Sequence, residues 1–413
     1  MVGGLCAALV LALVSAPAAP AVSEESAGLP LGDPTLVETR ETTVLADGVT
    51  LTRIVRGRRY ARAREIQTTT RGPWRVNVLE IDPAVAAGTL RSTYGYDLAR
   101  VEKVTAMAPT AGALAAVNAS FFAFTASALY PGDPVGLGIY GGELLSEPTA
   151  SGAEVSALLD ARDGTIRMDR FTWRGATVNR RTGLVLPLEH LNHPPVVPAG
   201  CRKLRRPTRC SKPGDTVHLS PRFSRATPSG RGVEAVLDAR GCLVRRAMRR
   251  GTILKPRQTA LQATGRETRR LWRLTESGCL DRRVELVASD GEPVELGPWL
   301  SGVNGRWRLT SRGVNVVPHR PRDPFFARHP RTFIGRSETG TVLLVTVDGR
   351  RSSSVGTTLG ETADVALALG MRDAINLDGG GSTTMVAAGE MVSTPSGSGE
   401  RAVGDALVFV PGP

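Results

Sequence analysis

Lysine, aromatic residues and long apolar runs are all scarce in this 413-residue chain. Only four of its 52 basic residues are lysines, so the rest are arginines. Aromatic residues make up 5% of the chain, whereas it contains 46 glycines and 28 prolines. This composition favours short strands and turns over long helices. The apolar run at residues 5–14 is too short to span a bilayer, and no other stretch looks transmembrane.

Closely spaced cysteine pairs are also missing, which argues against a zinc knuckle. Beyond the N-terminal segment the cysteines are Cys201, Cys210, Cys242 and Cys279. An even number of cysteines in an exported chain suggests two disulfides, and four cysteines allow three pairings. We expect Cys201–Cys210 with Cys242–Cys279, because the first pair would close a short loop rich in arginine and proline.

The N-terminus is typical of an export signal. The apolar run is followed by small residues around two possible cleavage sites, although no basic residue precedes the run. We expect residues 1–21 to be a signal peptide, residues 22–45 a flexible leader, and residues 46–413 one catalytic domain. The predicted location is therefore extracellular or in the cell wall, with no stable membrane insertion after the signal is removed.

The formal net charge is +13 and the sequence pI is about 10.3. Such a chain attracts polyanions through long-range electrostatics. No nucleic-acid-binding motif is present, so we expect no nucleic-acid partner. Anionic cell-wall polymers or phosphorylated glycans suit an exported protein better. The alternative explanation is that the arginine content only reflects a GC-rich genome.

Alternation of apolar and polar residues predicts strands at 49–55 and 74–81. A short helix is expected over residues 102–114, leading into a buried strand end at 115–118. Residues 194–214 are basic, rich in proline and contain two cysteines, so they are expected to form a surface insertion.

The C-terminal third has the clearest pattern. Residues 341–347 form a nearly continuous β-branched apolar run, which indicates a central strand. A helix is expected over 359–369, since Thr358 and Glu361 have the spacing of a capping box. A second buried strand, residues 374–378, leads directly into three glycines.

Asp378 lies at the tip of that strand and is followed by three glycines, residues 379–381. This arrangement lowers the stability of the fold, so a structural role alone explains it poorly. Three glycines lose much backbone entropy and offer no side chains to pack. They do allow a ligand close to the main chain and can present N–H groups to an anion. Ser382 and Thr383 add hydroxyl donors. The pattern therefore suits a phosphate or a sugar hydroxyl, although a tight turn capped by Asp378 is the structural alternative.

The stretch Asn376-Leu377-Asp378-Gly379-Gly380-Gly381-Ser382-Thr383 resembles the signature of the phosphodiester glycosidase family. Further blocks similar to that family follow the same order, at residues 117–122, 331–335, 345–350, 358–361, 395–396 and 403–407. The resemblance thus runs from Asn118 to the C-terminus and is weakest in the middle. One departure is that Ala119 and Ser120 stand where the family usually has Gly and then Gly or Asp.

The resemblance implies an α+β fold, with a large mixed or antiparallel sheet assembly and a few short helices in one catalytic domain. It also implies hydrolysis of a sugar-1-phosphodiester, in which water releases the sugar and leaves a phosphomonoester. Because the leaving phosphate is a weak base, it needs little protonation. The site must instead activate water and stabilise the negative charge of the phosphate. The expected substrate is a sugar-1-phosphodiester or an anionic glycan.

Candidate roles follow from the resemblance and the chemistry. Asp378 is expected to be the base or nucleophile, with Glu361 and Asp348 as further catalytic carboxylates. Arg331 is expected to clamp phosphate, because its planar fork matches phosphate oxygens, and Arg350 is a second candidate. The other expected substrate-binding residues are Thr332, Asn118, Phe122, Asn376, Gly379, Gly380, Gly381, Ser382 and Thr383.

Each role has a structural alternative. Glu361 already has a structural role in the capping box. Asp348 could be a turn residue, and Arg350 could be a solvated surface residue. His329 could act as an acid or be structural. No cofactor is expected; carboxylates near a phosphate could hold calcium or magnesium, but no ligand spacing predicts a metal site. The competing functions are a phosphodiesterase, an ordinary glycosidase and a non-catalytic polymer-binding protein.

Overall fold

Antiparallel β-sheet dominates the computed structural model, which describes residues 28–412; the expected signal peptide lies outside them. The α-helices are α1 (Val104–Thr110), α2 (Glu267–Leu274) and α3 (Leu359–Ala368), and none of the helices in this range is long and apolar enough to cross a bilayer. The strands form five sheets. The expected α+β class, with mostly antiparallel sheets and few short helices, is confirmed.

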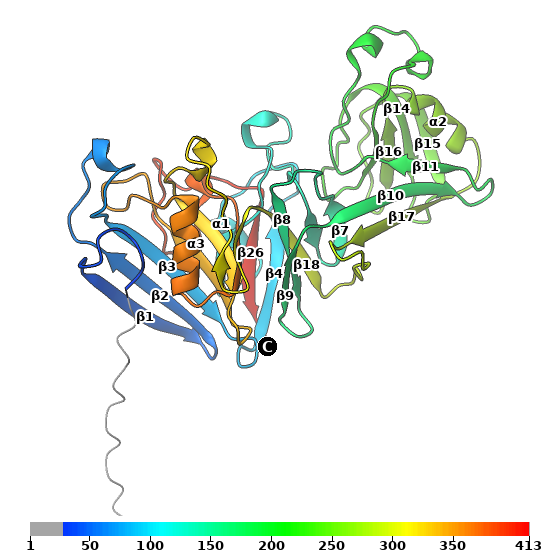
Figure 1. Ribbon diagram of the computed structural model, residues 1–413. Helices are drawn as coiled ribbons and strands as arrows, with labels where there is room; N and C mark the ends of the chain where they lie inside the picture. The colour runs from blue at the N-terminus through cyan, green and yellow to red at the C-terminus, as the bar shows by residue number, and fades with distance from the viewer. Residues whose placement is uncertain (1–27, 413) are drawn as a thin grey trace, which may run out of the picture.

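Residues 28–169 and 300–412 are called the body. An eight-stranded sheet forms one side of the body, in the order β1-β2-β3-β22-β21-β23-β19-β20. Its strands are β1 (Glu38–Ala46), β2 (Val49–Arg56), β3 (Trp74–Ile81), β22 (Val342–Val347), β21 (Arg331–Arg336), β23 (Asp373–Asn376), β19 (Arg308–Ser311) and β20 (Val314–Asn315). The apolar run predicted as a central strand is β22, whose six residues are all buried. Helix α3 covers one face of this sheet (Figure 1) and begins with the predicted capping box.

A five-stranded sheet packs on the other face, in the order β25-β24-β5-β26-β4. Its strands are β25 (Glu390–Met391), β24 (Met385–Ala387), β5 (Ala115–Asn118), β26 (Asp405–Pro411) and β4 (Gly88–Tyr94). Leu79 and Leu344 of the first sheet share a core with Val117 and Leu407 of the second. This core brings the ends of β5 and β23 to the same region of the body.

A third sheet extends the body in the order β7-β6-β18-β8-β9. Its strands are β7 (Glu143–Ser146), β6 (Gly138–Tyr140), β18 (Leu300–Arg306), β8 (Glu154–Asp160) and β9 (Ile166–Asp169). The chain leaves this sheet after β9 and returns at β18. The intervening residues, 170–299, are called the lobe; Figure 1 shows them in green, projecting from the body.

The lobe contains two sheets and helix α2. Its strands are β10 (Thr172–Asn179), β11 (Val185–Leu188), β12 (His190–Leu191), β13 (Thr216–Leu219), β14 (Gly230–Leu237), β15 (Leu243–Arg250), β16 (Thr259–Ala263) and β17 (Leu280–Val287). The pair β12–β13 is parallel, whereas the other strand pairs within residues 28–412 are antiparallel. The predicted disulfides Cys201–Cys210 and Cys242–Cys279 both form in the lobe, and the first closes the basic insertion.

The segment expected as a flexible leader is folded from residue 28 onward. Leu29 and Leu31 are fully buried beside Ile54 and Trp74, and β1 pairs along its length with β2. The difference arises because β1 is an edge strand with mostly exposed residues, so it lacks the apolar alternation by which a strand is recognised.

Two histidine–carboxylate pairs join the lobe to the body. His190 Nδ1 lies 2.6 Å from Glu147 Oε1, and His193 Nδ1 lies 2.6 Å from Asp133 Oδ2. The hydrogen bond that His190 Nδ1 donates to Glu147 raises the pKa of His190. Burial favours neutral His193, but the hydrogen bond and charge of Asp133 outweigh it, so the pKa of His193 is raised too.

The pair at Glu147 predicts a pH-dependent contribution to stability. Because the folded-state pKa of His190 is raised above the ordinary value of about 6.5, the contribution is complete below that value and is lost as pH rises through the raised pKa. Replacing Glu147 by Gln should lower the free energy of unfolding by roughly 1 kcal/mol or less in mild acid, and by less in mild alkali. Urea unfolding at both pH values tests this. An equal loss at both would assign the effect to the neutral hydrogen bond from Leu191 N to Glu147 Oε2.

Candidate active site

The glycine loop, residues 378–383, is held between the ends of two strands from different sheets. Asp378 N donates to Ala119 O over 2.9 Å, just beyond β5. Leu377 N donates to Thr332 O and Gly380 N to Pro330 O, both over 2.9 Å, at the start of β21. The structure therefore unites the three blocks that the sequence analysis placed in one site.

Asn118 fixes this arrangement from inside the core. Its side chain is fully buried, and its Nδ2 donates to Asp378 O over 2.6 Å. Its Oδ1 accepts from Thr332 Oγ1 over 2.8 Å and from Thr384 N over 3.0 Å. Asn118 was expected to bind a sugar hydroxyl, but these contacts make it and Thr332 positioning residues beneath the loop.

Two of the glycines leave room that a side chain would fill, and one of them also has a backbone conformation that favours glycine. Gly380 has φ of 62°, in the left-handed region that favours glycine. A Cβ at Gly381 would collide with the Arg401 guanidinium, and one at Gly380 would lie 3.2 Å from Arg350 Nη2. The absence of side chains therefore lets two cationic groups approach the loop backbone.

His329 orients one of these cations. His329 Nε2 lies 2.9 Å from Pro324 O, so Nε2 carries the proton and Nδ1 accepts from Arg350 Nη2 over 3.2 Å. Burial lowers the pKa of His329, which agrees with a neutral ring. Arg401 Nη1 donates to Ser382 Oγ over 3.5 Å, and its guanidinium lies 4.5 Å from the Phe124 ring centroid. The loop is thus flanked by two positive charges.

The Asp378 carboxyl lies within this cationic setting. Asp378 as a whole is partly exposed, but its carboxyl group is buried. This burial raises the pKa of Asp378 to about 6, although the hydrogen bond with Ser382 and the charge of Arg401 both lower it. Asp405 also raises the pKa of Asp378 through like-charge repulsion. Asp378 is therefore ionised at neutral pH and can be protonated in mild acid.

Asp405 is a carboxylate to which the sequence analysis gave no role. It is 1% exposed and accepts from Ser120 N over 2.7 Å and from Tyr140 Oη over 2.6 Å. Arg401 was missed as well. Asp405 lies within a block that resembles the family, and that was the available signal; Arg401 lies just before this block, after a run of Ser and Gly without periodicity.

Arg331 has a different environment from the phosphate clamp that was expected. It is 3% exposed, and burial lowers its pKa to about 9. Its Nη2 donates to Phe325 O and Ala327 O over 2.8 and 2.7 Å, and its Nε to Thr357 O over 3.2 Å. Only Nη1 lacks a hydrogen bond among the described residues, so Arg331 mainly ties two loops together.

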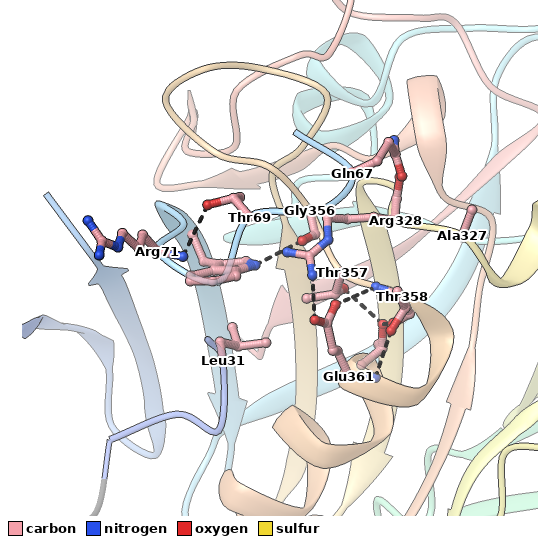
Figure 2. Close-up of polar contacts among 12 residues, drawn as sticks. Leu31, Gln67, Thr69, Arg71, Ala327, Arg328, Gly356, Thr357, Thr358 and Glu361 are labelled. Atoms are coloured by element: carbon pink, nitrogen blue, oxygen red, sulfur yellow. Dashed lines mark hydrogen bonds and ion pairs between the residues drawn. The ribbon is translucent and has the colours of Figure 1, made fainter. Parts of the chain in front are cut away.

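Both carboxylate oxygens of Glu361 are hydrogen-bonded to other protein groups, as Figure 2 shows. Its Oε1 accepts from Arg328 Nη2 over 2.6 Å, and its Oε2 accepts from Thr358 N over 2.8 Å. Arg328 is 7% exposed and lies over the Trp74 ring at 5.5 Å. Both oxygens of Glu361 therefore serve the helix cap and a nearly buried ion pair.

Asp348 faces a separate cavity of about 520 Å³, which Arg53, Arg75 and Asn77 also line. Burial raises the pKa of Asp348 to about 6, and Thr394 N donates to its Oδ1 over 3.0 Å. The glycine loop does not line this cavity. Asp348 follows β22 and Asp378 follows β23, at the same end of the eight-stranded sheet. Asp378 does not line the cavity that Asp348 faces.

The remaining predicted residues surround the loop in different ways. Phe122 is partly buried and packs edge-on against Phe124, with ring centroids 6.0 Å apart. Ser382 is fully buried. The buried Asn376 Oδ1 and Thr383 Oγ1 have no hydrogen-bond partner within residues 28–412. Unsatisfied polar atoms of this kind are unusual in a packed core, and ligand sites are one place where they occur.

Metal ligation has no support in the described part of the chain. No group of three or more His, Cys, Asp or Glu residues there is placed to hold a metal ion.

Removal of the Asn118 side chain should loosen the site and the fold together. Asn118→Ala would leave a carbonyl, a hydroxyl and an N–H without their buried partner, so we expect the free energy of unfolding to fall by about 1–3 kcal/mol. Thr332→Val removes one of these hydrogen bonds and should cost about 1 kcal/mol. Denaturant unfolding of both variants measures the difference; equal losses would contradict a central role for Asn118.

Glu361→Gln separates a structural from a catalytic role for this residue. The amide keeps an acceptor for the helix cap but loses the charge that pairs with Arg328. We expect a loss of roughly 2 kcal/mol in unfolding free energy, because one partner of a nearly buried pair loses its charge. Turnover per folded molecule should change little. A large fall in turnover with unchanged stability would restore Glu361 as a catalytic carboxylate.

Residues 244–410 match the sequence model of the family described as phosphodiester glycosidase. The SPbeta prophage-derived uncharacterized protein YomE of Bacillus subtilis (strain 168) is 40% identical over 82 residues, which are 20% of this chain and 13% of that protein. This chain therefore spans only a small part of that relative's length.

Two solved structures share the fold. A Burkholderia pseudomallei K96243 protein, named as a candidate exported protein, aligns with a TM-score of 0.77 and 26% identity over 93% of this chain and 98% of that chain. A hypothetical protein from Synechocystis aligns with a TM-score of 0.66 and 17% identity, over 90% of this chain and 63% of that chain. The resemblance first seen in the glycine signature is thus confirmed over residues 244–410, which match the sequence model of the phosphodiester glycosidase family.

Proposed function

We propose that the protein is a secreted hydrolase that cleaves the sugar–phosphate glycosidic bond of sugar-1-phosphodiesters. The observation that carries this proposal is the Asp378 carboxyl at a glycine loop that is flanked by Arg350 and Arg401. The family match supports hydrolysis of this general kind.

The phosphate is proposed to lie over the glycine loop. Arg350 and Arg401 supply guanidinium donors, which form charge-assisted hydrogen bonds to phosphate oxygens. His329 keeps Arg350 in place through its neutral Nδ1. These groups stabilise the negative charge that grows on the departing phosphate.

The sugar's anomeric carbon is proposed to lie beside Asp378. In the base route, Asp378 takes a proton from water while the water oxygen bonds to the anomeric carbon. The bond from that carbon to the phosphate oxygen breaks, and its electron pair leaves with the phosphomonoester. In the nucleophile route, Asp378 bonds to the anomeric carbon while the bond from that carbon to the phosphate oxygen breaks, and the phosphomonoester leaves with the electron pair. Water then bonds to the anomeric carbon, the bond to Asp378 breaks to restore its carboxylate, and the water proton passes to solvent.

The proposed location is the cell surface or medium, and the proposed substrates are cell-wall or extracellular glycans. The export-like N-terminus and the two disulfides support an oxidising compartment. The name of the Burkholderia structure agrees with this setting.

The pKa of Asp378 predicts the acid limb of the pH profile. Asp378 must be ionised in either route, and its pKa is about 6. Thus kcat/KM for a methyl phosphodiester of N-acetylglucosamine-1-phosphate should be constant above that pKa and fall about tenfold per pH unit below it. Asp378→Asn should reduce turnover by about 100-fold or more.

Asp348→Asn is the matched control, because the pKa of Asp348 is also about 6. This variant should keep the acid limb. Loss of the limb in Asp348→Asn, with the limb intact in Asp378→Asn, would move the catalytic role to Asp348. Reaction in ¹⁸O-labelled water separates the competing reactions: label in the sugar supports the proposal, whereas label in the phosphate means P–O cleavage.

A further inference from the structure

The excess positive charge of this chain is confined to the lobe. Residues 170–299 contain 26 Lys and Arg against 11 Asp and Glu, a net charge of +15. The rest of the chain has 26 against 28, a net charge of −2. A genome-wide preference for arginine would not place all of the excess in one folded unit. The distribution therefore points to a function of the lobe itself.

These charges lie on the surface. All the basic residues of the lobe are exposed except Arg246 and Arg250. Arg231 of β14 donates to Leu204 O, and Arg269 of α2 donates to Thr208 O over 3.3 Å. These hydrogen bonds place the disulfide-closed insertion against both β14 and α2. Arginines from three separate segments therefore form one surface.

This surface, called the lobe patch, comprises Arg205, Arg206, Arg209, Arg231, Arg269 and Arg273. None of the six forms an ion pair within residues 28–412; the one acidic residue of α2, Glu267, pairs with Arg266 and Arg270 instead. Unpaired guanidinium groups suit bidentate binding of phosphate oxygens. The insertion and the loops at the top of the body, including the cyan loop, rise on the same side of the molecule in Figure 1.

The aromatic residues disfavour a nucleic acid as the partner. The large exposed aromatic residues, Tyr60, Tyr96 and Phe124, all lie outside the lobe. Trp272 on α2 is covered by the Arg246 guanidinium at 3.9 Å from the ring centroid. Binding of single-stranded nucleic acids relies on aromatic faces that stack with bases, and the lobe patch offers none. Its chemistry matches repeated phosphates without bases.

We propose that the lobe patch is a docking surface for a polymer of phosphodiester-linked units, which it holds beside the candidate active site. This inference rests on the proposed function and makes its substrate a polymeric phosphodiester rather than a free small molecule. Holding the polymer raises the local concentration of its scissile bonds at Asp378.

The test compares two triple variants that remove the same charge. The patch variant is Arg205→Ser with Arg206→Ser and Arg209→Ser, three exposed residues of the disulfide-closed insertion. The control is Arg58→Ser with Arg59→Ser and Arg312→Ser, three exposed residues of the body. None of the six forms an ion pair in the described chain. Circular dichroism and thermal unfolding confirm that both variants fold.

Binding is measured with poly(glycerol phosphate) at several salt concentrations, and turnover with the small methyl phosphodiester. We expect the patch variant to raise the Kd for the polymer by roughly tenfold and to reduce its salt dependence, since fewer counterions are released. The control should change the Kd less than twofold. Turnover of the small substrate should stay unchanged in both variants.

The outcomes separate the docking surface from the proposed function. Equal weakening by both variants, or no binding of the polymer by the unaltered chain, would overturn the docking surface even if the small substrate is hydrolysed. Tighter patch-dependent binding of an oligothymidylate with the same number of phosphates would also overturn it and favour a nucleic acid. Patch-dependent polymer binding without turnover of the small substrate would support the docking surface and reject the proposed function.

Discussion

One buried amide holds the candidate site together. The Asn118 side chain links the end of β5 to the backbone of Asp378, the hydroxyl of Thr332 and the N–H of Thr384. These partners come from two sheets and from parts of the chain more than 200 residues apart in sequence. Because a buried amide left without partners is costly, the three segments can only settle in one mutual arrangement. The position of the glycine loop, and so of its flanking arginines, depends on that arrangement.

The molecule divides its chemistry between two units. The nearly neutral body builds a small site with two guanidinium groups, one carboxyl of raised pKa and a second, buried carboxyl beside it. The lobe carries the excess charge over a wide surface. A short-range site can discriminate one phosphodiester from another, whereas a diffuse positive surface acts at a distance and through many weak contacts. In the proposed function, these two tasks fall to separate sheets.

Local sequence patterns predicted the elements, whereas the surroundings of the candidate site residues depend on the folded chain. The β-branched run at β22, the capping box at α3 and the short Cys201–Cys210 loop needed only local information. The environments of Arg331 and Glu361 depend on partners such as Phe325 O and Arg328, which only the folded chain brings near. A capping-box spacing showed that Glu361 had one structural task but not that Arg328 supplied a second. Arg401 lay outside any pattern, since its relation to Gly381 is purely spatial.

The last strand of the chain has a consequence for the order of assembly. Strand β26 lies between β5 and β4 in its sheet, and its first residue is Asp405. The strand that carries Asn118 therefore has an unpaired edge until residues 405–411 are in place. Pairings this distant in sequence form late and slowly in folding. A chain that has been synthesised through the lobe but not yet through β26 would have all its lobe charges but no assembled site. Attraction to a polyanion would then precede assembly of the candidate site.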